Sequence, residues 1–283
     1  MKTGLILEGG ASRTLFTAGV LDVLMDNDVK ANYIIGTSAG ISSGVSFASG
    51  QRGRNYEVYT TYMPDKRYMG FKYFLDKNNK SYYNMKFVFD DIPNIHCKYD
   101  FDALSSFEGE VVAAVTDYET GSPEYIPVAA DDTAFYTLRA TCALPIMFPP
   151  IEINGKKYMD GGIADSIPFE HAIKNGCGKN IVILTRHRDY RKKKSNAIKL
   201  LRKIYHYSDG FAEALESRYI NYNNCLERLH SAEKQGKVFV IAPPEPLNYS
   251  RIESNKEKLI EMYNIGIKTA ENVIDDLKKY LTE

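Results

Sequence analysis

The sequence lacks the features that would place it in several broad protein classes. Its four cysteines, Cys97, Cys142, Cys177 and Cys225, are widely spaced and form no C-x-x-C pair. They match neither a zinc site nor a disulfide framework, so we expect reduced, partly buried thiols. The 36 basic and 36 acidic side chains cancel, which argues against binding nucleic acid through bulk electrostatics. We therefore expect no nucleic-acid partner and look for function in local sites.

Long hydrophobic runs are also missing. No stretch reaches the roughly 18 apolar residues that a transmembrane helix needs. The apolar residues 5–7 are interrupted by Glu8 before the hydrophobic part of a signal peptide could develop. We therefore expect a cytoplasmic protein. Its 283 residues, 44% of them hydrophobic, are enough to bury one large core or two small ones.

Short apolar runs alternate with helical periodicity along the first two-thirds of the chain. This alternation is typical of a parallel sheet covered by helices. The pattern predicts strands at residues 5–7, 33–35, 111–115, 125–128, 157–159, 181–184 and 238–241. It predicts helices at residues 15–27, 132–142, 169–175, 198–229 (with room for a break) and 254–281. Residues 56–92 have no clean period, and we interpret them as an insertion that shapes a pocket.

One segment of the chain is strongly basic. Residues 186–203, from Arg186 to Lys203, hold nine Lys or Arg side chains against one Asp. A solvated loop that enters a helix would account for this run, and so would peripheral contact with a phospholipid headgroup or membrane surface. Both interpretations remain open at this point.

The pattern G-x-S-x-G occurs at residues 36–40, directly after an apolar run and before a helix-compatible one. In that context the motif carries a nucleophilic serine on a sharp, strained turn, whose flanking glycines let the neighbouring chain pass. The turn also places the hydroxyl at a helix N-terminus, where free N–H groups favour negative charge. A second match at residues 40–44 offers Ser42, but Ser42 would lie about one turn inside the helix. We therefore predict Ser38 as the nucleophile, with an ordinary helix N-cap as the alternative.

Acyl transfer also needs donors for the oxyanion of the tetrahedral intermediate. The turn at residues 9–13, Gly-Gly-Ala-Ser-Arg, could provide exposed backbone N–H groups at another helix N-terminus. It could also be a plain turn or a nucleotide-phosphate loop. The nucleotide interpretation is weak because the chain contains neither G-x-G-x-x-G nor G-x-x-x-x-G-K-[ST].

The predicted base is Asp160, which ends the expected strand 157–159 and precedes two glycines. The histidines are scattered, and a Ser-Asp-His triad would need a late one, which leaves His206 and His230 as alternatives. An aspartate near its ordinary pKa of about 3.9 is a poor base for an alcohol. A Ser-Asp dyad therefore requires desolvation of the carboxylate and a working oxyanion hole.

Taken in chain order, these motifs resemble the bacterial patatin-like phospholipase family. The resemblance rests on residues 7–21, 36–40, 143–150 (Ala-Leu-Pro-Ile-Met-Phe-Pro-Pro) and 160–162, and it covers most of residues 3–170. It implies a three-layer α/β/α core with a mainly parallel central sheet. We assign this core to residues 1–185, with the insertion near 56–92, and a helical C-terminal extension that packs on it to residues 186–283.

The resemblance further implies a Ser-Asp dyad hydrolase that uses no metal or cofactor. Ser38 corresponds to the family's nucleophile and Asp160 to its dyad aspartate, while Gly9, Gly10, Ala11 and Arg13 correspond to its oxyanion loop, G-G-G-x-[KR]-G. Ala11 replaces the third glycine of that loop and Thr14 the last. Backbone donors do not depend on the side chain, so Ala11 is tolerable at negative φ, whereas a positive φ would distort the hole.

The leading hypothesis is a serine hydrolase that deacylates (lyso)phospholipids or related lipids through an acyl-Ser38 intermediate. Hydrophobic side chains from the insertion would line the acyl pocket, with plain core packing as the alternative for each: Phe71, Phe74, Leu75 and Phe87. Two other functions remain open. One is an esterase or thioesterase without preference for lipids, and the other is a lipid-binding or regulatory module with weak turnover.

Overall fold

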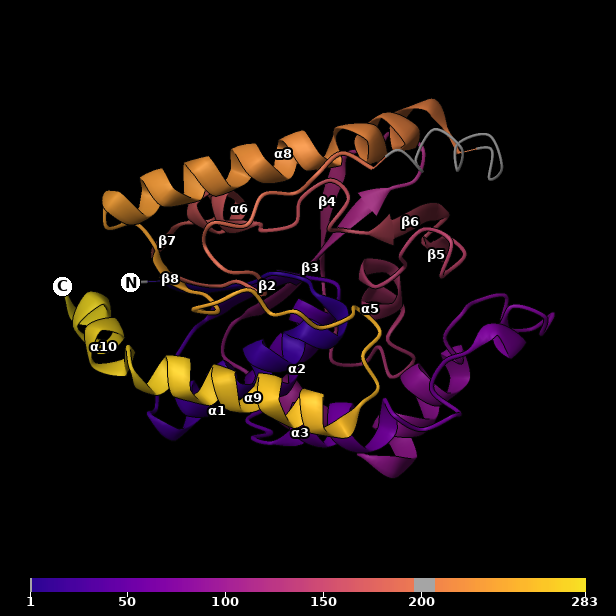
Figure 1. The fold of residues 1–283 in the computed structure, drawn as a ribbon, viewed down its shortest axis with the longest axis horizontal. Helices are drawn as coiled ribbons and strands as arrows, with labels where there is room; N and C mark the ends of the chain where they lie inside the picture. Colours follow the sequence, from indigo (N-terminus) through magenta and orange to yellow (C-terminus); the bar gives the residue numbers. More distant parts are fainter. Residues whose placement is uncertain (1, 196–206) are drawn as a thin grey trace.

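A mixed sheet of eight strands runs through the part of the protein that the computed structural model describes, residues 2–195 and 207–283 (Figure 1). Its order is β5-β6-β3-β2-β1-β7-β8, and β4 also pairs with β3, outside this order. The strands are β1 (Lys2–Leu7), β2 (Tyr33–Thr37), β3 (Glu110–Asp117), β4 (Pro123–Pro127), β5 (Ile151–Ile153), β6 (Lys156–Asp160), β7 (Cys177–Ile183) and β8 (Phe239–Ile241).

The central part of this sheet is parallel. β1 lies between β2 and β7 and is parallel to both, β3 continues the parallel set beside β2, and β8 continues it beside β7. Among the described strands, the antiparallel pairs are β3 with β4, β3 with β6, and β5 with β6. The mainly parallel sheet expected from the sequence is therefore confirmed.

Helices cover both faces of the sheet, which gives three layers (Figure 1). One face carries α1 (Thr14–Asp26), α2 (Ala39–Ala48), α9 (Lys256–Glu271) and α10 (Ile274–Thr282). The other face carries α6 (Phe169–Lys174) and α8 (Asp209–Lys234). Successive side chains of β1 point to opposite faces, as the pleat requires. Leu5 and Leu7 accordingly pack in the first layer, and Ile6 packs in the second.

The insertion predicted near residues 56–92 consists of short, irregular turns. They are α3 (Arg54–Glu57), the π-helix η2 (Val58–Tyr62), the 3₁₀-helix η3 (Phe71–Tyr73) and the π-helix η4 (Phe87–His96), followed by α4 (Phe101–Ser105). Neither type of turn has the 3.6-residue period of an α-helix. This is why the sequence showed no clean periodicity there.

Three predicted helices differ from the observed ones. The helix predicted at 132–142 is the shorter α5 (Tyr136–Thr141), because Phe135 adopts a left-handed conformation with φ 53° just before it. The helix predicted at 254–281 is two helices, with the break at residues 272–273. Part of the helix predicted at 198–229 lies outside the described residues. Within them, α8 begins after Ser208, whose hydroxyl accepts the N–H of Phe211, and it continues to Lys234.

The C-terminal region packs directly on the sheet and its helices. β8 extends the sheet beside β7, and α9 lies along α1. The two helices approach so closely that a Cβ on Gly19 would lie 2.3 Å from the carbonyl oxygen of Tyr263. The boundary at residue 185 between a core and an extension stays a prediction. No helix within the two described ranges combines the length and apolar character that crossing a bilayer requires.

Candidate functional site

Ser38 stands on the turn between β2 and α2 in a strained backbone conformation. Its φ is 56° and its ψ is −136°, a region that residues other than glycine rarely adopt. Its N–H donates to Thr141 Oγ1 at 2.8 Å, and that hydroxyl donates to the carbonyl oxygen of Ala114 at 2.6 Å. Gly40 permits the sharp turn, because a Cβ there would lie 2.6 Å from the carbonyl oxygen of Glu8. Tertiary contacts thus hold the strained serine in place.

Ser42, the competing match to the serine motif, lies inside helix α2. Its N–H donates to the carbonyl oxygen of Ser38 at 3.3 Å, and its hydroxyl lies 3.7 Å from the Cys142 sulfur. Its amide is therefore committed to the helix, as expected. Burial, followed by the nearby charge of Asp160, raises the pKa of the Cys142 thiol to about 12, so this thiol is protonated at neutral pH.

Strand register brings Asp160 to the level of Ser38. Thr37 at the end of β2 is paired with Ala114 on β3, and the next residue of β3, Val115, is paired with Asp160 on β6. The serine and the carboxylate therefore flank one strand at the same end of the sheet. Both side chains line one polar cavity.

The Asp160 carboxyl group is almost fully buried, with 2% of the residue exposed. Its Oδ1 accepts the N–H of Gly162 at 2.7 Å, whereas Oδ2 has no well-aligned hydrogen-bond partner among the described residues. Burial raises the pKa of Asp160, and the nearby Arg218 guanidinium and Ser38 hydroxyl offset part of that rise. The carboxylate is thus more basic than an ordinary one and lies close to the serine hydroxyl.

The residues predicted to form the oxyanion loop, Gly9, Gly10, Ala11 and Arg13, lie at and just before the short helix η1 (Ala11–Arg13). Within the described chain, the N–H groups of Gly10 and Ala11 have no hydrogen-bond acceptor, while Ser12 N–H donates to the carbonyl oxygen of Arg251 at 3.1 Å. Ala11 has φ 50°, so the substitution of glycine by alanine falls on a left-handed position. Such a conformation costs a residue with a Cβ about 1–2 kcal/mol.

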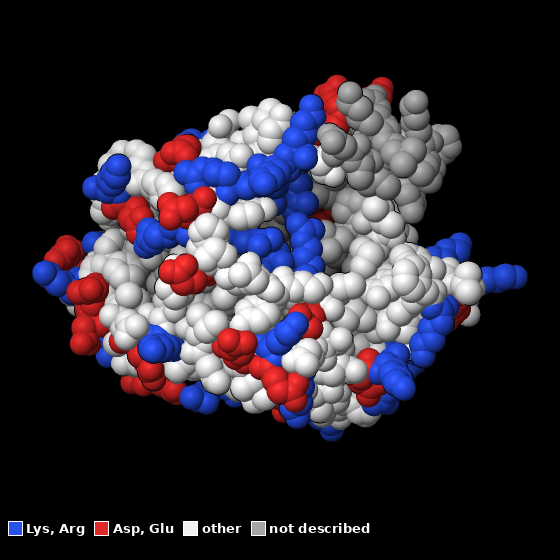
Figure 2. Space-filling view, in the orientation of Figure 1, with Lys and Arg blue, Asp and Glu red and all other residues white. Residues whose placement is uncertain are grey.

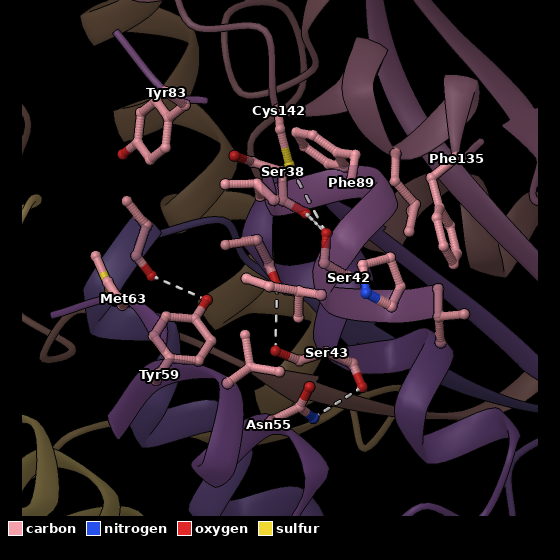
Figure 3. A pocket seen from close by; sticks show the side chains of 18 of the residues that line it. Ser38, Ser42, Ser43, Asn55, Tyr59, Met63, Tyr83, Phe89, Phe135 and Cys142 are labelled. Atoms are coloured by element: carbon pink, nitrogen blue, oxygen red, sulfur yellow. Dashed lines mark hydrogen bonds between the residues drawn. The ribbon is translucent and has the colours of Figure 1, made fainter. Parts of the chain in front are cut away.

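An apolar cavity opens on one side of Ser38 (Figure 3). The insertion contributes much of its wall, as expected. The cavity is lined by Ser38, Ala39, Val58, Tyr59, Met63, Tyr68, Tyr83, Val88, Phe89, Phe135, Leu138 and Phe148, among others. Tyr59 also donates a hydrogen bond to the carbonyl oxygen of Ala11 at 3.4 Å, which ties this wall to the oxyanion loop.

The side chains that we expected to line this cavity do not reach it. Phe71 and Leu75 are 79% and 86% exposed, and Phe87 packs in a separate cluster with Ile92 and Cys97. Phe74 makes a tilted ring contact with Phe71 and is likewise absent from the cavity wall. The expectation was wrong because the irregular turns of the insertion give no period from which inward-facing positions could be read.

A second, polar cavity lies on the other side of Ser38 and contains Asp160. Five cationic side chains of the described residues line it: Arg13, Arg186, Lys192, Arg218 and Arg251. Figure 2 shows Lys and Arg side chains gathered around a hollow beside α8. Sequence reasoning identified only Arg13, through the loop motif, and the basic run that contains Arg186 and Lys192. The other two cations carry no local signal.

Glu8 is a further residue that the sequence did not single out. Its carboxylate is buried at the end of β1 and accepts hydrogen bonds from the Thr185 N–H at 2.7 Å and hydroxyl at 3.1 Å. It also accepts one from the Tyr222 hydroxyl at 2.7 Å. Glu8 therefore ties together β1, the end of β7 and α8, next to the polar cavity.

The remaining sequence candidates lie elsewhere. His230 is on α8 and lines neither cavity, and His206 lies outside the described residues. Of the basic segment, Arg188 and Arg191 form ion pairs with Glu233 and Glu227, while residues 196–203 lie outside the described residues. The described residues contain no group of three His, Cys, Asp or Glu side chains suited to a metal ion.

Comparison with known families gives two matches along the chain. A model described as patatin-like phospholipase matches residues 5–173, which include the serine turn, the oxyanion loop and the predicted base. A model described as a domain of unknown function, DUF6363, matches residues 208–282. The second match covers α8, β8, α9 and α10.

Curated proteins similar to this chain include three with informative coverage. The uncharacterized protein YjjU of Escherichia coli (strain K12) is 24% identical, over 100% of this chain and 80% of that protein. The probable lipid hydrolase 463L of Invertebrate iridescent virus 6 is 25% identical, over 93% of this chain and 85% of that protein. The lysophospholipase NTE1 of Candida albicans is 23% identical over 97% of this chain, which spans only 20% of that much longer protein.

Among solved structures, that of VipD from Legionella pneumophila has a similar fold. The TM-score is 0.51 at 11% sequence identity, and the match covers 97% of this chain and 67% of that one. At this identity the likeness concerns the fold alone.

Proposed function

We propose that this chain, which belongs to the patatin-like phospholipase family, deacylates (lyso)phospholipids through an acyl-Ser38 intermediate. The premise is that it is a carboxylic-ester hydrolase that acts on lipid acyl groups. The observation that carries the proposal is the position of a strained Ser38 beside the buried, more basic Asp160, between an apolar and a polar cavity. The apolar cavity suits an acyl chain, and the polar cavity suits the remainder of the substrate.

In the proposed mechanism, Asp160 takes the hydroxyl proton of Ser38 as Oγ forms a bond to the ester carbonyl carbon. The amides of Gly10 and Ala11 hold the resulting oxyanion. As the intermediate collapses, the bond to the alcohol oxygen breaks and Asp160 returns its proton to that oxygen. Water then attacks the acyl-serine, gives a proton to Asp160, and the fatty acid leaves as Ser38 recovers its proton.

The first prediction concerns the nucleophile. We expect Ser38→Ala to lower kcat/KM for a p-nitrophenyl ester by about 10³-fold or more, since the covalent route is removed. We expect a fluorophosphonate probe to label the parent protein and to leave this variant unlabelled. Ser42→Ala, four residues away in α2, is the matched control and should keep both labelling and turnover. Turnover that survives Ser38→Ala and fails in Ser42→Ala would reverse the assignment.

A second candidate function is a lipid-binding or regulatory module with little turnover. The left-handed Ala11 in the oxyanion loop favours it, because strain there could displace the amide donors. Folded protein that binds vesicles but resists the fluorophosphonate would support this candidate. An esterase without lipid preference would instead hydrolyse short-chain p-nitrophenyl esters as fast as long-chain ones, with or without phospholipid vesicles.

We also propose that the protein works in the cytoplasm and touches membranes peripherally through the basic segment 186–203. Within its described part, Lys193 and Lys194 are exposed and form no ion pair with a described carboxylate. These two lysines are therefore available to an anionic surface.

A further inference from the structure

We propose that the polar cavity beside Ser38 binds a phosphate monoester carried by the alcohol part of the substrate. The enzyme would then deacylate lysophosphatidate-like lipids in preference to zwitterionic or uncharged ones. This inference rests on the proposed function and specifies its substrate class.

The first argument is an excess of positive charge. The five cations of the cavity come from four separate segments of the chain: the oxyanion loop (Arg13), the loop after β7 (Arg186 and Lys192), helix α8 (Arg218) and the loop before α9 (Arg251). None of them forms an ion pair with a carboxylate in the described residues. Among the described residues, only two carboxylates, those of Glu8 and Asp160, line the same cavity.

The second argument is that two of these cations are held in place by aromatic rings rather than by carboxylates. The Arg186 guanidinium lies 4.5 Å from the ring centroid of Tyr190, and Lys192 Nζ lies 4.3 Å from that of Tyr222. The two rings are themselves in edge contact, with centroids 5.8 Å apart. Cations that rest on aromatic faces keep their N–H donors available to an anion.

Arg13 and Arg218 add buried donors to this cavity. Arg13 is 5% exposed, and its buried Nε has no hydrogen-bond partner among the described residues. Arg218 Nε donates to the carbonyl oxygen of Gly162 at 2.5 Å, which anchors that side chain next to Asp160. Buried polar groups without partners are rare in proteins, so the Arg13 Nε is a donor that an anion in this cavity would satisfy.

Mutual repulsion within the cavity supports the same conclusion. Burial, and then the neighbouring Arg186 and Arg251, lower the pKa of Arg13 to about 10. Burial, and then Arg218 among other neighbours, lower the pKa of Lys192 to about 7. A bound anion would relieve both effects, because an opposite charge stabilises the protonated forms.

The third argument concerns the sign and size of the ligand charge. A phosphate monoester carries close to two negative charges at neutral pH, whereas the phosphodiester of a choline lipid carries one and adds a quaternary ammonium. That ammonium would enter a cavity with five cations. Glu8, the carboxylate away from the reaction centre, is already occupied by three hydrogen bonds from Thr185 and Tyr222. The charges therefore favour the monoester.

The geometry connects this anion site to the reaction. Ser38, Ala11 and Leu144 line both cavities. An ester whose carbonyl lies at Ser38 can place its acyl chain in the apolar cavity and its alcohol part among the cations. Binding energy from the phosphate would then position the ester for attack.

The first test compares substrates with one acyl chain. We would measure kcat/KM of the parent protein for 1-oleoyl-glycerol-3-phosphate, 1-oleoyl-glycero-3-phosphocholine and 1-oleoyl-glycerol in neutral detergent micelles. We expect kcat/KM to be about tenfold or more higher for the phosphate monoester, because the other two lipids lack the doubly charged group that contacts the cations. Equal or faster hydrolysis of the choline or uncharged lipid would overturn the inference while leaving the proposed function intact.

The second test uses variants of the cavity. We expect Lys192→Gln and Arg251→Gln each to lower kcat/KM for the phosphate monoester by about tenfold, and to change it less than about twofold for 1-oleoyl-glycerol. Lys234→Gln, at the exposed last residue of α8 and outside both cavities, is the matched control and should leave both substrates unchanged. Equal losses on both lipids, or losses in Lys234→Gln as large as those in Lys192→Gln, would contradict a phosphate site.

A binding measurement separates this inference from the proposed function. We would titrate inorganic phosphate and glycerol 3-phosphate into the Ser38→Ala protein by calorimetry, which requires no turnover. We expect saturable binding of both that weakens about tenfold or more in the Ser38→Ala, Arg251→Gln double variant. If phosphate binds but no ester is hydrolysed, the proposed function fails and the anion site stands. A third outcome is that glycerol 3-phosphate inhibits hydrolysis of an uncharged ester without competing with that ester. This result would overturn the headgroup assignment, because the cavity would then bind a separate regulatory phosphate.

Discussion

At the scale of single residues, the site depends on two departures from ordinary local conformation. Ser38 and Ala11 both have positive φ although neither is glycine. The surrounding hydrogen bonds and packing must maintain these conformations, which is typical of functional sites. Each departure leads to a measurable expectation, and so does the burial of Asp160.

The pH dependence follows from the burial of Asp160. The carboxyl group serves as a base only when ionised, and burial raises its pKa while Arg218 lowers it. We expect kcat/KM for neutral p-nitrophenyl butyrate to fall with decreasing pH through a midpoint above the ordinary aspartate pKa of about 3.9. In Arg218→Gln that midpoint should move to higher pH. A midpoint that is unchanged, or that moves to lower pH, would show that a group other than Asp160 controls the acid limb.

The same shift has a defined sign for stability. Because the folded-state pKa of Asp160 is raised above the unfolded value, its contribution to stability is present below the unfolded pKa. That contribution is lost as pH rises toward the folded pKa. Burial of Asp160 thus lowers stability at neutral pH, where the proposed mechanism needs this carboxyl group ionised.

Ala11 provides a test of strain in the oxyanion loop. We expect Ala11→Gly to raise the free energy of unfolding by up to about 1 kcal/mol, since glycine adopts φ 50° without a Cβ clash. Turnover of a p-nitrophenyl ester should stay equal or increase. Ala214→Gly, within helix α8, is the control and should lower the free energy of unfolding by about 0.5–1 kcal/mol. Urea denaturation measures the free energy of unfolding of both variants. A lower free energy of unfolding for Ala11→Gly would show that Ala11 is not strained.

At the scale of elements, regular periodicity decided which segments could be predicted. The alternation of buried strands with helices was read correctly along β1, α1, β2 and β3 because these elements are regular and well buried. The π- and 3₁₀-helical turns of the insertion have other periods, so their inward-facing residues could not be read. Helix ends were also missed where a single residue changes conformation, as Phe135 does before α5.

The contact between α1 and α9 depends on the lack of a side chain at Gly19. A Cβ there would lie 2.3 Å from the carbonyl oxygen of Tyr263 and 2.9 Å from the N of Ile267. We expect Gly19→Ala to lower the free energy of unfolding by about 1–3 kcal/mol, since the clash outweighs the gain of about 1 kcal/mol in helix propensity. Asn264→Ala, on the exposed face of α9, should be neutral or slightly stabilising. A Gly19→Ala protein of unchanged stability would show that the helices can separate without cost.

At the scale of the whole molecule, the C-terminal region completes both the core and the site. Leu226 and Leu229 of α8 pack with Ile6 and Val182 of the sheet, and Arg218 and Arg251 face the polar cavity. Residues 186–283 thus supply four of the five cations that line the polar cavity beside the serine: Arg186, Lys192, Arg218 and Arg251.

A truncation tests whether residues 1–185 fold alone. We expect the shortened chain to lack cooperative urea unfolding by circular dichroism, because removing α8, β8 and α9 exposes the apolar faces that they cover. Co-expression of residues 186–283 as a separate chain should restore a folded, fluorophosphonate-reactive complex. A cooperative transition in residues 1–185 alone would instead support a core that is independent of its extension.

The sequence by itself determined the three-layer class, the serine turn and the predicted dyad partner. These features are local: each depends on a short run of residues whose periodicity or glycine spacing is visible in the chain. Only the tertiary structure decided that Asp160 lies level with Ser38, through the register of β2, β3 and β6. It also brought together the five cations of the polar cavity. Residues so far apart in the chain share no local pattern, because their proximity depends on strand order and helix packing.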